Sequence, residues 1–175
     1  GKELEKIGSR VMGSENHAKV GIIFDWENYW ALEYTSGPNR DLRYVDQIEQ
    51  MYNYFYNKNI AVDMIPIDAD FSKYDLVAAP VLYMVKDGVA ESLEAYVQAG
   101  GTLITTYMSG IVGQSDNVHL GGYPGPLRKM AGVWVEEIAA LAPEQRNKIR
   151  FADGTEEECR LVCDLMHLEG AEEIA

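Results

Sequence analysis

The sequence predicts an α/β fold of three layers, in which a mostly parallel sheet lies between helices on both faces. Short apolar segments of strand length alternate with longer segments whose apolar residues repeat at helical spacing, and this order is typical of βαβ units. The clearest strand, residues 20–24 ("VGIIF"), carries no polar side chain, as expected of a strand covered on both faces. The 175 residues are enough for one domain with a single core.

The other elements follow in order along the chain. Helices are expected at residues 2–12, about 42–58 and 89–99, where apolar residues recur every three or four positions, with a short helix at about 127–131. Strands are expected at residues 20–24, 60–67, 76–79, 101–107 and 132–138, with shorter strands at 148–151, 160–165 and 171–175. Asp41 is expected to cap the second helix, and Gly100 with Gly101 to end the third. Pro80 leaves open whether the strand at 76–79 resumes after it. Residues 109–126, rich in Gly, Ser, Asp, Asn and Pro, predict a long loop, and a loop of that length usually has a function or forms a contact.

The charge and the cysteine content limit the partners that we expect. The formal net charge is −13, with 28 acidic and 15 basic residues, so nucleic acid and anionic membranes would repel the protein. No apolar run approaches the roughly 20 residues that span a bilayer. The N-terminal segment lacks the apolar core of a signal peptide, and the two cysteines fit a reducing compartment. We therefore expect a cytoplasmic location.

The stretch after the first strand, "DWENYW" at 25–30, is the first candidate site. It lies at the carboxyl end of a strand, where α/β proteins bind ligands. Asp25 and Glu27 could act as an acid and base pair in glycoside hydrolysis. Alternatively, Asp25 or Asn28 caps a turn, and Trp26 and Trp30 form a contact surface, because aromatic residues are enriched at interfaces. We favour the contact surface.

Three further kinds of site find less support in the residues. Ser109 follows a strand and His119 could serve as its base, but the G-x-S-x-G elbow of the α/β-hydrolases is missing, so a glycine-rich loop with polar caps is favoured. Cys159, Cys163 and His167 have a spacing that would suit zinc on a helix, yet they fall in segments of strand and turn. We expect buried free thiols there and no metal. No glycine-rich phosphate-binding motif is present, and the acidic "DWENYW" would repel phosphate, so no nucleotide cofactor is expected.

With these residues considered, the chain resembles the middle domain, or trimerisation domain, of the family 42 β-galactosidases. The resemblance rests on "VGIIFDWENYWALE", on "VLYMV" and on the long string "GGTLITTYMSGIVGQSDNVHLGGYPGPLRKMAGVWVEE". It covers residues 4–138 well and continues more loosely through "FADG" and "CDLMHLEGAEEIA".

The resemblance implies a flavodoxin-like or class I glutamine amidotransferase-like fold without the amidotransferase cysteine. It implies that residues 1–175 are one assembly domain of a longer, retaining β-galactosidase, with residues 1–18 as the helix and linker that lead in from a missing barrel. A (β/α)8 barrel needs about 250 residues, so the catalytic glutamates would lie outside this chain and the chain alone would be inactive. No residue of this chain is therefore expected to be catalytic.

The expected partners are further copies of the chain and the missing barrel. A homotrimer is implied for the longer protein, and a monomer or weak oligomer for this chain alone. Candidates for the contact surface or the substrate funnel are Asp25, Trp26, Glu27, Asn28, Trp30, Ser109, His119 and Tyr123. The alternative is a galactoside-binding module in which Trp26 and Trp30 stack on a sugar ring.

Overall fold

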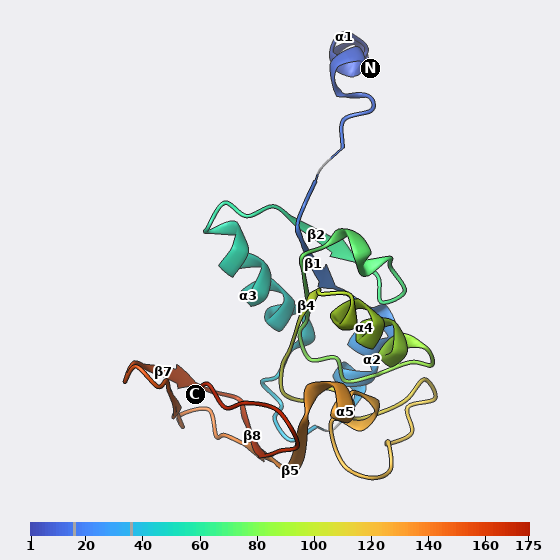
Figure 1. The fold of residues 1–175 in the computed structure, drawn as a ribbon. Helices are drawn as coiled ribbons and strands as arrows, with labels where there is room; N and C mark the ends of the chain where they lie inside the picture. The colour runs from blue at the N-terminus through green and yellow to red at the C-terminus, as the bar shows by residue number, and fades with distance from the viewer. Residues whose placement is uncertain (16, 36) are drawn as a thin grey trace.

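A parallel sheet of four strands forms the centre of the molecule (Figure 1). The computed structural model describes residues 1–15, 17–35 and 37–175. The strands are β1 (Val20–Ile23), β2 (Val62–Ile65), β3 (Leu76–Ala79) and β4 (Thr102–Thr105), and their order across the sheet is β2-β1-β3-β4. Val20 pairs with Val62 on one side and with Leu76 on the other, so β1 is a central strand. All four of its residues are buried, as its apolar sequence predicts.

Helices cover both faces of this sheet. Adjacent residues of a strand point to opposite faces, so Ile22 and Ile23 enter different cores. Ile22 packs in the core that also holds residues of α2 (Trp26–Tyr34) and α3 (Tyr44–Tyr56). Ile23 packs in the core that holds residues of the 3-10 turn η1 (Phe71–Lys73) and α4 (Val89–Gln98). The predicted three-layer α/β fold is confirmed.

Helix α2 and the start of α3 depart from the predictions. No helix is expected directly after the first strand, but α2 begins there with Asp25 as its N-cap. The next helix begins at Tyr44 with Arg43 at the N-cap, so the expected cap by Asp41 is wrong. Instead, the backbone N–H of Asp41 donates to Asn39 Oδ1 at 2.8 Å, and Asn39 shapes the turn before the helix.

Strand β3 ends at Ala79 and does not resume after Pro80. Val81 has a φ of 47°, a left-handed conformation that stops a strand. Its N–H donates to Thr106 Oγ1 at 2.8 Å, outside the ladder of the sheet. Helix α4 and strand β4 lie where the sequence predicts them, and Gly100, with a φ of 99°, follows the helix.

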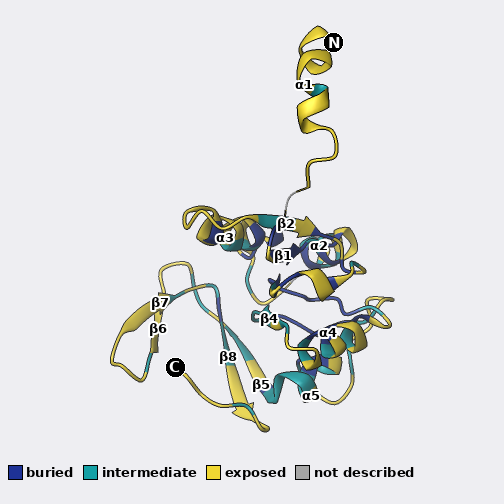
Figure 2. Ribbon diagram, turned by 45° about the horizontal axis from the view of Figure 1, so that its top comes forward, coloured by how far each residue is buried: buried dark blue, intermediate teal, exposed yellow. Residues whose placement is uncertain are grey.

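The C-terminal third adds two antiparallel pairs. Strand β5 (Val133–Ala140) pairs with β8 (Val162–Leu168), and β6 (Asn147–Arg150) pairs with β7 (Glu156–Cys159). The predicted loop after β4 is irregular as far as the short helical turns η2 (Gly125–Leu127) and α5 (Arg128–Ala131). Residues 171–175, expected as a strand, form none. The β6–β7 hairpin is largely exposed and extends away from the parallel sheet (Figure 2).

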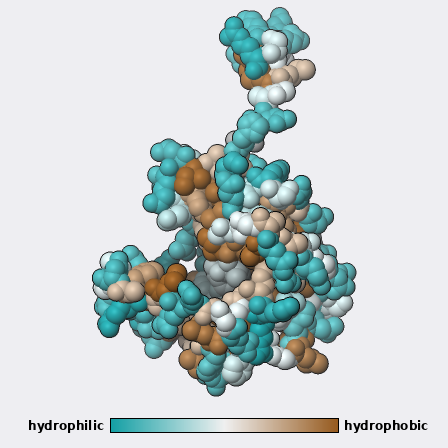
Figure 3. All heavy atoms as spheres, viewed as in Figure 1, coloured by the Kyte–Doolittle hydropathy of each residue, from teal (hydrophilic) through white to brown (hydrophobic). Residues whose placement is uncertain are grey.

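Helix α1 (Lys2–Val11) stands apart from the body of the molecule, as Figures 1 and 3 show. The predicted helix is confirmed, but none of its residues is buried. Leu4, Ile7 and Val11 form its apolar side and are 67%, 47% and 51% exposed.

Candidate functional site

The polar stretch after β1 forms the first turn of α2 at the carboxyl edge of the sheet. Asp25 caps this helix, because its Oδ2 accepts a hydrogen bond from the N–H of Asn28 at 3.0 Å. The N–H of Asp25 donates to the hydroxyl of Tyr44 at 3.3 Å. Burial is the main reason why the pKa of Tyr44 rises to about 12, so its hydroxyl keeps its proton throughout the physiological range. Asp25 is therefore a structural residue.

Asn28 is fully buried and joins α2 to the segment after β3. Its Nδ2 donates to the carbonyl of Val81 at 2.9 Å, and its Oδ1 accepts from the N–H of Met84 at 2.7 Å. This single side chain pairs two backbone groups that the end of β3 leaves without strand partners. The structure thus places Asn28 inside the protein, in contrast to the expectation of a surface contact.

Lys86 forms ion pairs with both carboxylates of the stretch. Its Nζ lies 2.8 Å from Asp25 Oδ1 and also pairs with Glu27 Oε2. Burial alone would lower the pKa of Lys86, but hydrogen bonds to the carboxylates of Asp25 and Glu27 outweigh it, so the pKa is raised. Two carboxylates that share one ammonium group are poorly suited to act as a free acid and base, so the geometry favours a structural ion-pair cluster.

The aromatic residues of the same helix point outward. Trp26, Trp30 and Tyr34 are spaced four residues apart, so they lie along one side of α2, and they are 59%, 51% and 90% exposed. We call these three residues the aromatic stripe. Trp26 is backed by Phe24, with ring centroids 5.0 Å apart in an edge-on arrangement, and lies 6.1 Å from Trp30. The stripe is thus an exposed apolar surface on a helix that Asp25 and Asn28 fix to the sheet.

Ser109 is buried in a network of structural hydrogen bonds. Its Oγ accepts from the N–H of Leu82 at 3.1 Å, donates to the carbonyl of Thr106 at 2.7 Å, and lies 2.7 Å from Thr105 Oγ1. His119, the base of the hydrolase hypothesis, is not among these partners. Its Nε2 is buried and has no hydrogen-bond partner within the described part of the chain. Ser109 therefore closes the turn after β4, and the structure gives no support to a Ser–His pair.

Tyr123 lies at the edge of an apolar hollow of about 580 Å³ between the loop after β4 and the β5–β8 ribbon. Its carbonyl accepts from the N–H of Val135 at 2.9 Å, which ties the long loop to β5. Asp164 is the acidic residue of this hollow, and its Oδ1 is buried without a hydrogen-bond partner among the described residues. Burial raises the pKa of Asp164 to about 6.

Of the residues in the zinc hypothesis, His167 contacts other side chains, and the two cysteines contact each other. His167 Nε2 lies 2.5 Å from Glu136 Oε2, and its ring stacks on Trp134 with centroids 4.9 Å apart. The sulfurs of Cys159 and Cys163 are 3.5 Å from each other. Within residues 1–15, 17–35 and 37–175, no group of three or more metal-ligating side chains is arranged to hold a metal ion.

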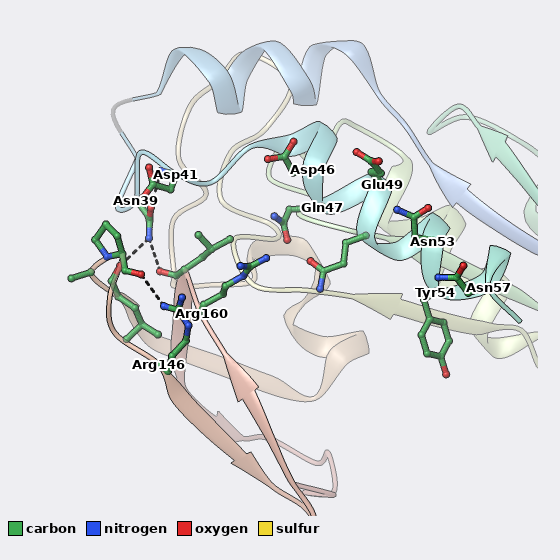
Figure 4. A pocket seen from close by; sticks show the side chains of 15 residues that line it. Asn39, Asp41, Asp46, Gln47, Glu49, Asn53, Tyr54, Asn57, Arg146 and Arg160 are labelled. Atoms are coloured by element: carbon green, nitrogen blue, oxygen red, sulfur yellow. Dashed lines mark hydrogen bonds between the residues drawn. The ribbon is translucent and has the colours of Figure 1, made fainter.

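A polar cleft of about 670 Å³ that the sequence does not predict lies between α3 and the segment from Leu141 to Leu161 (Figure 4). Asp46, Gln47 and Glu49 of α3 face it on one side, and Arg146 and Arg160 on the other. Figure 3 shows this face of the molecule hollowed between the β6–β7 hairpin and the body. Ordinary surface residues from two distant segments line the cleft, so no local sequence pattern marks it.

Comparison with known proteins places the chain in a family. Residues 18–175 match the family described as "Beta-galactosidase trimerisation domain". The chain is 50% identical to the β-galactosidase LacZ of Lactobacillus acidophilus over its whole length and covers 26% of that protein. The crystal structure of a β-galactosidase from Bacillus circulans sp. alkalophilus matches 99% of this chain with a TM-score of 0.95 and 46% identity, and 26% of that chain is covered. A β-galactosidase from Rahnella sp. R3 matches 99% of this chain with a TM-score of 0.90 and 41% identity, and 28% of that chain is covered.

The chain spans about a quarter of the length of these relatives. No helix in the described part of the chain combines the length and the apolar character needed to cross a membrane. The family match leaves out α1 and covers all of the sheet, the helices around it and both antiparallel pairs. The chain therefore belongs to the family of β-galactosidase trimerisation domains.

Proposed function

We propose that this chain is the assembly part of a longer β-galactosidase and holds its subunits together as a trimer. The observation that carries the proposal is the match of residues 18–175 to the trimerisation domain, together with relatives that are about four times as long as the chain. Hydrolysis of terminal β-galactosides would then belong to a catalytic barrel outside the chain. Two cysteines are too few for a disulfide framework and fit a reducing compartment, so the proposal includes the cytoplasm.

Within this role, we assign the aromatic stripe to a contact with a neighbouring subunit or with the barrel. Tryptophan and tyrosine are the residues that most often dominate the energy of an interface. Phe24 and the cap of α2 hold Trp26 in place before binding, so little conformational freedom is lost when a partner covers it. Glu27, 58% exposed at its side chain, lies beside the stripe and is available for a polar contact at its edge.

The test uses the complete β-galactosidase polypeptide that contains this chain. Trp26 and Trp30 are both replaced by alanine, and the molar mass is measured by sedimentation across a concentration series. We expect the trimer to dissociate at concentrations at least about 100-fold higher than for the unmodified protein, because each buried aromatic anchor contributes about 2 kcal/mol or more. Tyr54→Ala is the matched control, since Tyr54 on α3 is 58% exposed and lies outside the stripe.

The outcomes separate two claims. A trimer that persists unchanged in the double variant would overturn the assignment of the stripe to the assembly contact and leave the assembly role intact. An unmodified protein that stays monomeric at every concentration would overturn the assembly role itself.

A further inference from the structure

The two cysteines of the chain lie side by side at one corner of the C-terminal region. Cys159 is the last residue of β7, and Cys163 is the second residue of β8. Their Sγ atoms are 3.5 Å apart, and both side chains are half-buried and free. Formation of a disulfide requires an S–S distance of about 2.05 Å, so the sulfurs need to approach by only about 1.5 Å.

The corner between the two cysteines is held in place by the rest of the molecule. Leu161 has a φ of 75°, which turns the chain sharply between β7 and β8. Its carbonyl accepts from Asn39 Nδ2 at 2.8 Å and from the N–H of Leu141 at 2.8 Å. Asn147 Nδ2 lies 3.6 Å from the sulfur of Cys163. These contacts position the two thiols before any reaction takes place.

Both thiols can be reached from outside. Cys159 and Cys163 line the hollow of about 580 Å³ beside the β5–β8 ribbon. Cys159 also lines a second hollow of about 550 Å³, where Arg146 and Arg160 are its neighbours. Glu158 also lines this hollow, so its lining carries two positive charges against one negative charge, a balance that suits an anionic reagent.

We propose that Cys159 and Cys163 form a thiol–disulfide exchange site that reacts with low-molecular-weight disulfides of the glutathione type. The thiolate of one cysteine attacks a sulfur of oxidised glutathione, forms a mixed disulfide and releases one glutathione thiolate, which takes a proton from solvent. The thiolate of the other cysteine then attacks the protein sulfur of the mixed disulfide and releases the second glutathione. The protein loses two electrons and two protons, and one oxidised glutathione is reduced to two glutathione molecules. Burial raises the pKa of Cys159, which lowers the fraction of its reactive thiolate at neutral pH.

The bond would tie two parts of the fold together. The β6–β7 hairpin is exposed along most of its length, and its end joins the β5–β8 ribbon through this corner. A disulfide between the end of β7 and the start of β8 would restrict the movement of the hairpin against the ribbon. This inference concerns the chain's own thiols and does not depend on the assembly role.

The experiment uses the chain of residues 1–175, whose two cysteines are its only thiols. The folded protein is equilibrated in buffers with a graded ratio of oxidised to reduced glutathione, quenched with acid and analysed by mass spectrometry. We expect a species about 2 Da lighter than the reduced chain, without bound glutathione. The effective concentration of the two thiols is expected to be at least about tenfold higher in the folded chain than in the same chain in concentrated guanidinium chloride, because folding positions them.

Two matched variants and a second readout complete the design. Cys159→Ser and Cys163→Ser are each expected to accumulate only the mixed disulfide with glutathione. Hydrogen exchange of the β6–β7 amides is expected to slow in the oxidised wild-type chain. The proposal is overturned if the wild-type chain stops at the mixed disulfide, or if its effective concentration when folded does not exceed that of the unfolded chain.

Discussion

Asn28 shows how one buried side chain can decide the geometry of the edge of a sheet. It lies within a stretch of polar and aromatic residues, and nothing in this sequence distinguishes the buried Asn28 from its exposed neighbours. In the structure it supplies one donor and one acceptor to the backbone of Val81 and Met84, which are 53 and 56 positions further along the chain.

Replacement of Asn28 by leucine should therefore destabilise the protein strongly. Leucine has a similar volume but leaves the N–H of Met84 buried without a partner, and the carbonyl of Val81 keeps only its hydrogen bond from the N–H of Tyr83 at 2.7 Å. The unpaired N–H costs about 1–3 kcal/mol and the lost hydrogen bond to Val81 about 0.5–1.5 kcal/mol, so we expect the free energy of unfolding to fall by about 2–4 kcal/mol. Urea denaturation measures it, with Asn53→Ala on the exposed side of α3 as a control that should change stability by less than about 0.5 kcal/mol. A loss in Asn28→Leu as small as that of the control would contradict this role.

Whereas Asn28 stabilises the folded protein, the buried carboxylate of Asp164 destabilises it near neutral pH. Burial raises its pKa from 3.8 to about 6, so the folded state binds more protons than the unfolded state between these values. Stability contributed by this residue therefore decreases as the pH rises from about 4 to about 6, and the deficit stays constant above that range.

Asp164→Asn should remove this deficit. A shift of about two pKa units corresponds to about 3 kcal/mol, and partial exposure of the residue reduces the expected gain to about 1–2 kcal/mol near pH 8. Near pH 4 the variant should differ little from the wild type. Denaturation at both pH values gives the measurement, and Asp68→Asn, at an exposed carboxylate, is the control. A gain in stability that is equal at both pH values would show that the carboxylate charge is not its cause.

At the scale of elements, α2 is the part of the fold that the sequence conceals. A surface helix usually shows an apolar stripe towards the core and polar residues outside. In α2 the buried residues are Asn28 and Leu32, while Trp26, Trp30 and Tyr34 point outward. The usual pattern is partly inverted, because α2 buries the hydrogen-bonded side chain of Asn28 and exposes three aromatic rings. Of the stretch "DWENYW", Asp25 and Asn28 are buried and Trp26, Glu27 and Trp30 are exposed, so its role as a contact surface stays a prediction for the exposed residues.

The long loop after β4 is closed by the approach of Gly110 to Pro124. Gly110 has a φ of 68°, and a Cβ atom there would lie 2.0 Å from the carbonyl oxygen of Pro124. Gly154 has a similar φ of 85°, and a Cβ atom at that position would have no neighbouring atom within 4 Å. The two glycines therefore differ in contact distance and share their backbone conformation.

Comparison of Gly110→Ala with Gly154→Ala isolates the effect of the close approach. The control should lose about 1–2 kcal/mol from the left-handed conformation. Gly110→Ala should lose about 1–3 kcal/mol more, because the loop must move to admit the methyl group. Thermal or urea unfolding of the two variants gives the difference, and equal losses would mean that the loop adapts freely at this position.

At the scale of the whole molecule, net charge opposes association between copies of the chain, and exposed apolar surface favours it. Each copy carries a formal charge of −13, so copies repel at low ionic strength, while the aromatic stripe favours contact. Under the proposed assembly role, the chain by itself would have only part of a shared interface with which to overcome this repulsion.

We expect the isolated chain to be a monomer or a weak oligomer whose association strengthens with salt. Added salt screens the repulsion between copies and leaves the apolar contact largely unaffected. Sedimentation at low and at moderate ionic strength should show a mass that rises from 19.6 kDa towards a multiple of it only in the second condition. A mass that decreases with salt would indicate a contact built from opposite charges, and stable trimers at micromolar concentration would contradict the expected weakness.

The sequence by itself determined the parallel sheet, the positions of α3, α4 and the long loop, and the resemblance to the β-galactosidase trimerisation domains. These follow from local patterns, because a strand covered on both faces must be apolar along its length and a surface helix must repeat its apolar residues at its own period. Only the tertiary structure decided which residues of "DWENYW" face inward and which lysine pairs with Asp25. It also decided where the polar cleft lies and that the two cysteine sulfurs are in contact. Most of these depend on side chains tens of residues apart, such as Asp25 and Lys86, which are 61 positions apart and are brought together by the order of strands in the sheet.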